Sequence, residues 1–519
     1  MSQDLIDGSG CDDGILCTAI DSCSNGACIG SGLPDDHEDW IRVEADASAR
    51  HLTGPYRLMR DEDGGLRTLR GSAPGPVTLV ETVSGDPIEL AGDGEASGVF
   101  TLRYREDGLL EEARSVLRGP ARSAMDVFWL DADGTMGIAA TLSGAVRLGT
   151  DELGHIVDSG VVDPPHKVIA LLEPTGAHRW HRVVATTSAQ EIDHIGLVPV
   201  QSGIMAGLVH PGDTRVIGAN GQVDVPLPDT AVGYALTLVR FDENGVMLGA
   251  AVAAELPGGN AREVVLERLA DDSVGVGLQP EGDFTFGAPG AIKALTRTGV
   301  ADATVVGNLN HLGVPRWVAE LDGVVRGSMY LSASSAGGIL LRVRATNPAL
   351  RVDGRDIAVD SPPIVDGEAS VIVELDAQGA LRWSLSTEAE VGAMLARGDQ
   401  VIVAMTTRGD VALEPGSELR TDLPDDDVSL LIAAYSGGTL QWYERFAYVP
   451  YAWFRGGGET TVRVSALLSA PGGVGVVAQG RSFGSLTAGL GVTVERTGGV
   501  RFLTLLNSLG GASCGSFSF

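Results

Sequence analysis

The sequence predicts an all-β fold, and three observations support this prediction. Apolar runs of strand length alternate with turn residues along almost the whole chain. Glycine is abundant, with 71 residues among 519, whereas aromatic side chains make up only 5%. This composition suits many short strands joined by tight turns. The third observation is a repeat, in which a polar turn ends in glycine and the position four residues later is usually aromatic.

The repeat predicts the architecture. Its landing positions, each four residues after the last turn glycine, are 59 to 69 residues apart. They are Glu112, Trp180, Gly249, Trp317, Trp383, Trp442 and Phe502. One interval contains the four apolar runs 125–130, 136–142, 167–172 and 180–184, and four antiparallel strands per repeat are typical of a propeller blade. We therefore predict a β-propeller of seven four-stranded blades, with eight blades as the alternative.

Local chemistry explains glycine and tryptophan at this spacing. Glycine tolerates the positive φ that a tight turn requires, and a preceding Asp, Asn or Thr can hydrogen-bond the turn backbone. A tryptophan just inside the outermost strand buries a flat ring between neighbouring blades, and its indole N–H can reach a main-chain carbonyl. The predicted blade-packing residues are Trp40, Trp180, Trp317, Trp383, Trp442 and Phe502. Glu112 and Gly249 depart from the pattern, so blades one and three are expected to pack differently.

Three segments of the repeat resemble known propeller families. Segment 371–385, which contains Glu-Leu-Asp-Ala-Gln-Gly-Ala-Leu-Arg-Trp, and segment 475–484 are similar to the SBBP-type β-propeller repeats of large secreted bacterial proteins. Segment 175–180, Thr-Gly-Ala-His-Arg-Trp, is similar to the tryptophan-docking turn of quinoprotein and outer-membrane-assembly propellers. The resemblance spans roughly residues 40–510. It implies the fold and a secreted protein, but no activity.

The N-terminal segment is of a different kind. It places four cysteines within eighteen residues, and a segment this short cannot bury a core, so cross-links must hold it. It resembles the small cysteine-rich modules of secreted bacterial proteins. Disulfides are predicted in preference to zinc, because Cys-x-x-Cys pairs and partnering histidines are missing. The candidates are Cys11, Cys17, Cys23, Cys28 and Cys514, an odd number that leaves the pairing open.

These patterns divide the chain into four parts. Residues 1–33 form the cysteine-rich module, 34–50 a linker and closing strand, 51–510 the propeller, and 511–519 a C-terminal tail. The alternating run Trp40 to Glu44 has the phase of the outermost strands. It is expected to pair with the last blade near residues 500–506.

Charge and hydropathy exclude some partners. The net charge of −31 makes nucleic acid or an anionic membrane surface an unfavourable partner. No apolar run approaches the roughly 18 residues of a membrane span. Residues 1–10 have neither the basic start nor the apolar core of a signal peptide. An exported protein is therefore expected to have lost its signal.

The search for chemistry predicts no catalytic, cofactor-binding or metal-binding residue. The acidic stretches 93–97, 366–370 and 425–427 precede third strands, so a rim of carboxylates that could take calcium remains open. The turns 61–64 and 131–134 lack the later ligands of a calcium loop. His178 and His181 bracket Trp180 along a strand and are expected at most to cover a blade surface. The other histidines are scattered over loops and strands without Cys, Glu or His at ligand spacing; they are His155, His166, His194, His210 and His311. All seven are interpreted as structural or exposed.

The resulting expectation is a non-enzymatic, secreted or cell-surface propeller that binds a protein or glycan partner through one face. One alternative is a polysaccharide hydrolase or lyase with channel-facing carboxylates. Two acids and an arginine around one site would favour that alternative, and a bare apolar channel would count against it. The other alternative is a structural subunit of a surface layer or filament.

Overall fold

In the computed structural model, the described part of the chain is all-β, as predicted, and no helix occurs in it. The structure describes residues 20–24, 27–31, 40–44, 57–60, 66–72, 77–79, 88–90, 96–105, 109–120, 125–130, 134–142, 144–150, 155–157, 166–187, 190–201, 203–217, 224–228, 233–257, 259–287, 295–297, 304–310, 312–324, 329–346, 350–352, 355–357, 368–387, 389–408, 412–413, 428–449, 461–470, 473–488 and 492–506. Side chains are described at most of these positions between residues 67 and 443.

Four-stranded antiparallel units recur along these residues, and we number them 1 to 7. Unit 1 contains β4 (Arg57–Arg60), β5 (Leu66–Ser72), β8 (Ala96–Tyr104) and β9 (Leu110–Pro120), and unit 2 contains β10 (Met125–Leu130), β11 (Met136–Leu142), β14 (His166–Leu172) and β15 (His178–Thr186). Unit 3 contains β16 (Ile195–Val200), β17 (Gly203–Pro211), β20 (Tyr234–Asp242) and β21 (Met247–Leu256). Unit 4 contains β22 (Ala261–Arg268), β23 (Val274–Pro280), β26 (Thr304–Leu309) and β27 (Pro315–Asp322).

The later units follow the same order. Unit 5 contains β28 (Tyr330–Ala333), β29 (Ile339–Thr346), β32 (Glu368–Leu375) and β33 (Leu381–Thr387), and unit 6 contains β34 (Glu390–Arg397), β35 (Gln400–Arg408), β36 (Val428–Ser436) and β37 (Thr439–Val449). Unit 7 contains β38 (Thr461–Ala470), β39 (Gly473–Ala488), β40 (Val492–Leu506) and β3 (Trp40–Glu44). β37 also pairs with β39, which joins units 6 and 7 into one sheet.

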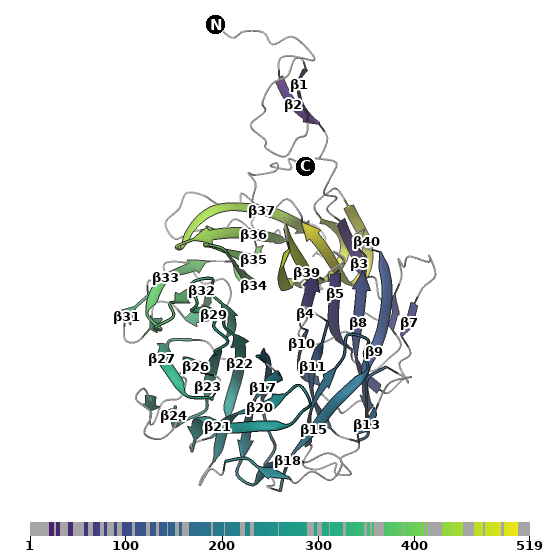
Figure 1. Ribbon diagram of the computed structural model, residues 1–519. Coiled ribbons are helices and arrows are strands. Elements are labelled where there is room, and N and C mark those ends of the chain that lie inside the picture. Colours follow the sequence, from purple (N-terminus) through teal and green to yellow (C-terminus); the bar gives the residue numbers. More distant parts are fainter. Residues whose placement is uncertain are drawn as a thin grey trace.

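The units stand side by side around a common centre (Figure 1). The first strand of each unit contacts the first strand of the next, from β4 through β10, β16, β22, β28 and β34 to β38, and β38 contacts β4. The first strands therefore form a closed circuit, and the fourth strands lie on its outside.

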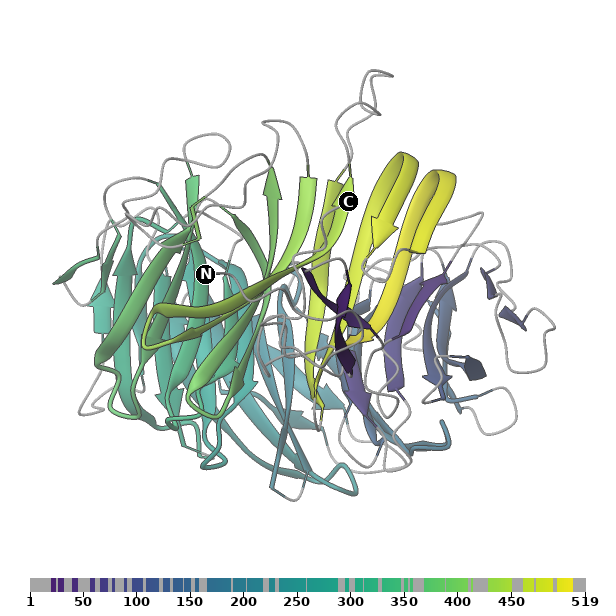
Figure 2. The ribbon, with the colours of Figure 1, turned by 90° about the horizontal axis from the view of Figure 1, so that it is seen from above.

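The N-terminal strand β3 completes unit 7. It pairs antiparallel with β40, with Trp40 opposite Leu505 and Glu44 opposite Arg501, which is the pairing that the alternating run predicted. In Figure 2 the yellow strands at the end of the chain stand beside the purple strands near its beginning. Hydrogen bonds thus tie the two ends of the ring together, although they are more than 450 residues apart in sequence.

Units 2 to 5 each lend a short hairpin to the unit before them. The hairpins are β12 (Val146–Leu148) with β13 (His155–Val157), β18 (Thr214–Ile217) with β19 (Val225–Pro226), β24 (Phe284–Phe286) with β25 (Leu295–Arg297), and β30 (Arg351–Val352) with β31 (Arg355–Asp356). Each arises between the second and third strands of its own unit, and its first strand pairs with β9, β15, β21 or β27 of the preceding one.

This exchange bears on the passages between second and third strands, which were considered as a possible acidic rim. Four of them instead run along the outer sheet edge, where they pair the backbone groups that an edge strand would leave open. The acidic segments 93–95, 366–367 and 425–427 lie outside the described residues. Two further pairs are β6 (Val77–Leu79) with β7 (Ile88–Leu90), and β1 (Ile20–Ser24) with β2 (Ala27–Ser31).

The hydrophobic core is divided into layers between successive units. Alternate residues of the second and third strands point to opposite faces, so each unit contributes to the layer on either side. In unit 5, for example, Leu341 and Val343 pack towards unit 4, whereas Leu340 and Ile372 pack towards unit 6. Burial of these apolar faces against one another is what holds consecutive units together.

A β-bulge recurs just before the landing position. In unit 2, Leu171 pairs with Trp180 and Leu172 with His178, so Arg179 is the extra residue. Units 1, 3, 4, 5 and 6 show the same shift, with Glu111, Leu248, Arg316, Arg382 and Gln441 as the extra residues. A bulge breaks the strict alternation of side chains, which affects a histidine cluster described below.

In units 3, 5 and 6, the turn glycine lies against the landing tryptophan of the unit before it. Gly176, Gly245, Gly313, Gly379 and Gly438 all have positive φ, between 73° and 85°, as the turn requires. A Cβ on Gly245 would lie 2.5 Å from the Trp180 ring, and one on Gly379 would lie 2.6 Å from the Trp317 ring. Trp180 and Trp317 are only 4% and 3% exposed. The turn of one unit thus packs directly against the indole ring of the unit before it.

The other landing positions differ from one another. Trp383 is half-buried and lies beneath Gly438. Where unit 3 has Gly249, the turn glycine Gly313 rests on Ala251 instead. The side chains of Trp40, Trp442 and Phe502 lie outside the described residues.

Candidate functional site

A polar cluster lies where the inner strands of units 4, 5 and 6 meet. Its members are Glu263 on β22, Tyr330 on β28, Arg342 and Arg344 on β29, and Glu390 on β34. We call these five residues the inner polar cluster. Elsewhere, the layers between units are mainly apolar.

Strand alternation explains how β29 presents two guanidinium groups. Arg342 and Arg344 flank Val343, which is fully buried in the layer shared with unit 4. Both arginines therefore point to the opposite face, towards unit 6. Arg342 is also the register partner of Tyr330, so the backbone of Arg342 lies directly beside the inner strand β28.

Two hydrogen bonds connect the cluster across the units. The backbone N–H of Met329, in unit 5, donates to Glu263 Oε2 of unit 4 at 3.0 Å. Arg342 Nη1 donates to the main-chain oxygen of Val391 in unit 6. The guanidinium of Arg342 consequently reaches an inner strand, although its own backbone belongs to a second strand.

Partial burial shifts the pKa of two members. Desolvation raises the pKa of Glu263, and the Met329 N–H and the charges of Arg342 and Arg344 oppose this shift. Desolvation also lowers the pKa of Arg342, and the neighbouring charge of Arg344 adds to the effect, against Glu263, Glu390 and Tyr330. All five side chains nevertheless stay partly exposed. They combine partial desolvation with access from solvent.

The cluster offers three kinds of interaction to a ligand. Paired guanidinium groups suit a carboxylate or another planar anion, which they can bind through parallel hydrogen bonds. The Tyr330 ring provides an apolar face with a hydroxyl at its edge. A carboxyl group with a raised pKa, such as Glu263, can hold a proton and donate it.

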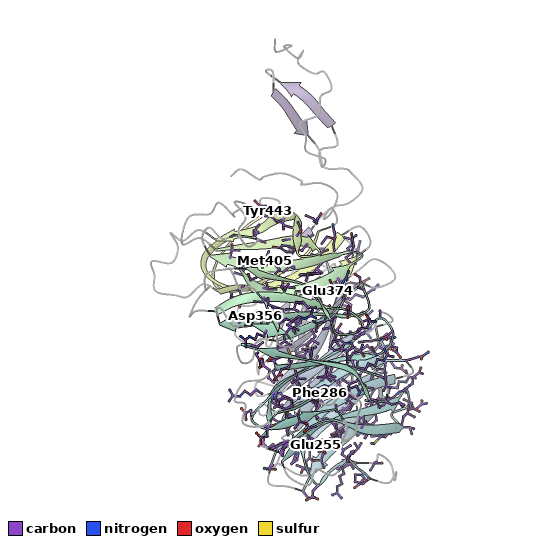
Figure 3. All side chains as sticks on the ribbon, turned by 90° about the vertical axis from the view of Figure 1, so that its left-hand side faces the viewer. Glu255, Phe286, Asp356, Glu374, Met405 and Tyr443 are labelled. Carbon is purple, nitrogen blue, oxygen red and sulfur yellow. The ribbon has the colours of Figure 1, made fainter. Side chains whose placement is uncertain are left out.

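Another buried carboxylate is structural. Glu374 of β32, labelled in Figure 3, is 5% exposed and accepts hydrogen bonds from Ser334 Oγ, Arg382 Nη1 and Trp383 Nε1. Three donors satisfy its oxygens, and no acid or base function is left for it. It anchors the Trp383 ring.

The predicted disulfide residues are only partly described. Cys23 and Cys28 are register partners across β1 and β2, and nothing further is described of their side chains. Cys11, Cys17 and Cys514 lie outside the described residues. Within the described part of the chain, no three His, Cys, Asp or Glu side chains are arranged ready to hold a metal ion, and no helix is long and apolar enough to cross a bilayer.

The interpretation of the histidines needs correction. His210 is structural, as expected, because its ring is 1% exposed and hydrogen-bonds Thr237 Oγ1 at 2.8 Å and the Pro211 oxygen at 2.7 Å. The view of His155 as a scattered histidine is wrong, since its ring lies with those of His178 and His181. His311 lies outside the described residues.

Sequence reasoning did not find the inner polar cluster. The pattern Arg342-Val343-Arg344 within an otherwise apolar strand was its one local sign. Glu263 and Glu390 could not be connected with it from sequence, because their proximity depends on how three units are placed around the centre.

Comparison with known proteins gives little guidance. No family model matches the chain, and no curated protein sequence matches it. Among solved structures, the polysaccharide lyase Uly1 is 11% identical, with 98% of each chain covered and a TM-score of 0.34. The extracellular domain of a one-component system from B. thetaiotaomicron is 9% identical, with 91% of this chain and 82% of that chain covered and a TM-score of 0.16. Likenesses this weak decide neither fold nor function.

Proposed function

We propose that this protein is a secreted or cell-surface β-propeller of seven blades that binds an acidic glycan at the inner polar cluster. The closed circuit of first strands and the completion of unit 7 by β3 support the propeller. The resemblance to SBBP-type repeats and the cysteine-rich N-terminal segment support export.

The observation that carries the binding proposal is the convergence of the five polar residues from three units. Apolar residues of similar volume would pack the units together at least as well as partly desolvated charges. Charges at this place are therefore better explained by a polar ligand. Burial raises the pKa of Glu263, against the charges of Arg342 and Arg344, so protonation of this carboxyl group leaves the two guanidinium groups with less negative charge beside them. The ligand that suits such a site is a sugar carrying a carboxylate, with Tyr330 against its ring.

Binding can be measured by calorimetry with polygalacturonate and alginate, which carry uronic acids, and with neutral dextran. The wild-type protein is expected to bind a uronic-acid polymer and not dextran. Arg344→Gln should weaken binding about tenfold, which is the value of one charge-assisted hydrogen bond. Arg351→Gln is the matched control, because it makes the same change on β30, where Arg351 pairs with Asp356. Absence of uronate binding, or equal losses in the two variants, would refute the proposal.

A second candidate is cleavage of such a polymer, and the raised pKa of Glu263 is the observation that favours it. A carboxyl group whose pKa is raised by burial is better suited to act as a general acid than an exposed one, and Arg342 and Arg344 would neutralise the substrate carboxylate. Incubation with each polymer would then release new reducing ends or the ultraviolet absorbance of an unsaturated uronate. Glu263→Gln should abolish the release and leave binding intact. A wild-type protein that binds the polymer without cutting it excludes this candidate.

The proposed compartment has a test of its own. Mass spectrometry of the protein recovered from its natural host should show at least one disulfide among the five cysteines. Five free thiols would remove the chief support for a secreted protein.

A further inference from the structure

Three histidine rings gather on the outside of units 1 and 2. His155 belongs to β13, the last strand of the sheet that contains unit 1, whereas His178 and His181 belong to β15 of unit 2. The ring centres of His155 and His178 are 4.9 Å apart, and each of these rings is 5.1 Å from that of His181. These histidines lie on other sheets than the inner polar cluster, on a fourth strand and a borrowed hairpin rather than on first and second strands.

The β-bulge at Arg179 explains why His178 and His181 meet. In a regular strand, residues three apart point to opposite faces. The extra residue shifts the alternation by one position, so His178 and His181 point to the same face. His178 Nε2 lies 3.0 Å from His181 Nδ1. The hairpin that unit 2 lends to unit 1 then brings His155 beside them.

The spacing fits three ligands of one metal ion. With Zn–N bonds of about 2.0–2.1 Å, imidazoles around a tetrahedral ion have ring centres roughly 5 Å apart. A histidine pair that served only to stabilise the surface would not need a third imidazole at the same distance.

The site is not preformed. His155 lies nearly parallel to His178, with 20° between the rings, instead of directing a nitrogen towards the other two. This accords with the absence of a ready three-ligand group among the described residues. His155 is exposed on a three-residue strand, so rotation of its ring meets little resistance. The nearby charge of Arg182 opposes a cation, but its guanidinium is directed to the His181 oxygen and over the Trp180 ring.

We propose that His155, His178 and His181 bind one Zn²⁺ ion, with water in the remaining position, and that the ion fastens the borrowed hairpin of unit 1 to unit 2. Borderline-soft divalent ions prefer imidazole, which distinguishes this site from a calcium site built of oxygen ligands. The proposal does not depend on glycan binding.

Cobalt can serve as the spectroscopic probe for the full-length protein, with its thiols blocked by alkylation and its metals removed by a chelator. One equivalent of Co²⁺ should give the visible absorption of a four- or five-coordinate site, and Zn²⁺ should displace it. His155→Ala should weaken Zn²⁺ binding at least about tenfold, and so should His178→Ala and His181→Ala. His194→Ala, which removes a partly exposed histidine of another unit, should bind like the wild type.

A second measurement protects the test against misfolding. Zn²⁺ should raise the thermal midpoint of the wild type and of His194→Ala but not that of His155→Ala, although all three should have equal midpoints without metal. Failure of the wild type to bind one equivalent would overturn the proposal. Unchanged affinity in the three cluster variants would overturn it too.

Discussion

Two junctions of the molecule are built alike but with different side chains: the one between units 1 and 2 and the one between units 2 and 3. At each, the turn before the fourth strand of one unit contacts the unit before it. At the second junction, the ring of Trp180 lies under Gly245, and its Nε1 donates to the Glu243 oxygen at 3.0 Å. At the first, the landing residue is Glu112, and Gly176 rests on Thr150.

The hydrogen bond is nevertheless kept at the junction without tryptophan. Arg67 Nη1 donates to the Pro174 oxygen at 3.1 Å, and Pro174 holds the same place in its turn, two residues before the glycine, as Glu243. Arg114 Nη1 adds a bond to the Thr175 oxygen at 2.6 Å. At these two junctions the turn carbonyl has a side-chain donor and the turn glycine has a surface to rest on, and Trp180 supplies both at only one of them. The indole does not play this part everywhere, because Trp317 lies under Gly379 with no hydrogen-bond partner for its Nε1 among the described residues.

The largest expected effect is that of removing the indole ring of Trp180. Trp180→Ala would leave a cavity beneath Gly245 and an unpaired carbonyl, so the free energy of unfolding should fall by about 3–5 kcal/mol. Urea denaturation measures this change. A loss below about 1 kcal/mol would mean that the ring covers the junction without supporting it.

Gly245→Ala should have the next largest effect. The new methyl group would collide with the ring at 2.5 Å, at a φ of 73°, and strain and overpacking together should lower the free energy of unfolding by about 2–4 kcal/mol. The matched control is Gly437→Ala, since Gly437 has a φ of 58° and open space around it. Its loss should be only about 1 kcal/mol. Equal losses would show that contact with the ring contributes nothing.

Arg67→Met should have a smaller effect on the junction between units 1 and 2. It keeps most of the side-chain length and removes the donor to the Pro174 oxygen, so the free energy of unfolding should fall by about 1 kcal/mol. Arg179→Met, which removes an exposed ion pair with Glu243, should change it by less than about 0.5 kcal/mol. If Arg179→Met proves the more harmful change in denaturation experiments, the equivalence of Arg67 and Trp180 is wrong.

The smallest effect concerns the polar contact at the inside of the ring, between units 4 and 5. The pKa of Glu263 is raised in the folded protein, so its contribution to stability is fully present below the ordinary glutamate pKa and is lost as the pH rises through the raised value. Glu263→Gln can still accept from the Met329 N–H and removes this titration. Denaturation at several pH values should show that the free energy of unfolding of the wild type, relative to that of the variant, falls as the pH rises from acidic to neutral. A relative free energy that rises over this range would contradict the assigned direction of the shift.

Local features of this fold were readable from the sequence, and long-range ones mostly were not, the pairing of β3 with β40 being the exception. The positions 176, 245, 313 and 379 were predicted as turn glycines because φ depends on the residue and its immediate neighbours. The destination of β12 and β13 was missed, because this hairpin completes a sheet edge belonging to the unit before its own. The bulge that brings His178 and His181 to one face was not foreseen either, since strict alternation takes no account of a bulge.

By itself, the sequence determined the all-β class, the period of the repeat, the turns and the strand that joins the two ends. Each of these follows from the order of apolar, polar, glycine and aromatic residues along the chain. Only the tertiary structure decided that Glu263, Arg342 and Glu390 share one place and that His155 lies beside His178 and His181. These groups come from different units, and the contacts between units depend on packing angles and register shifts that no local pattern specifies.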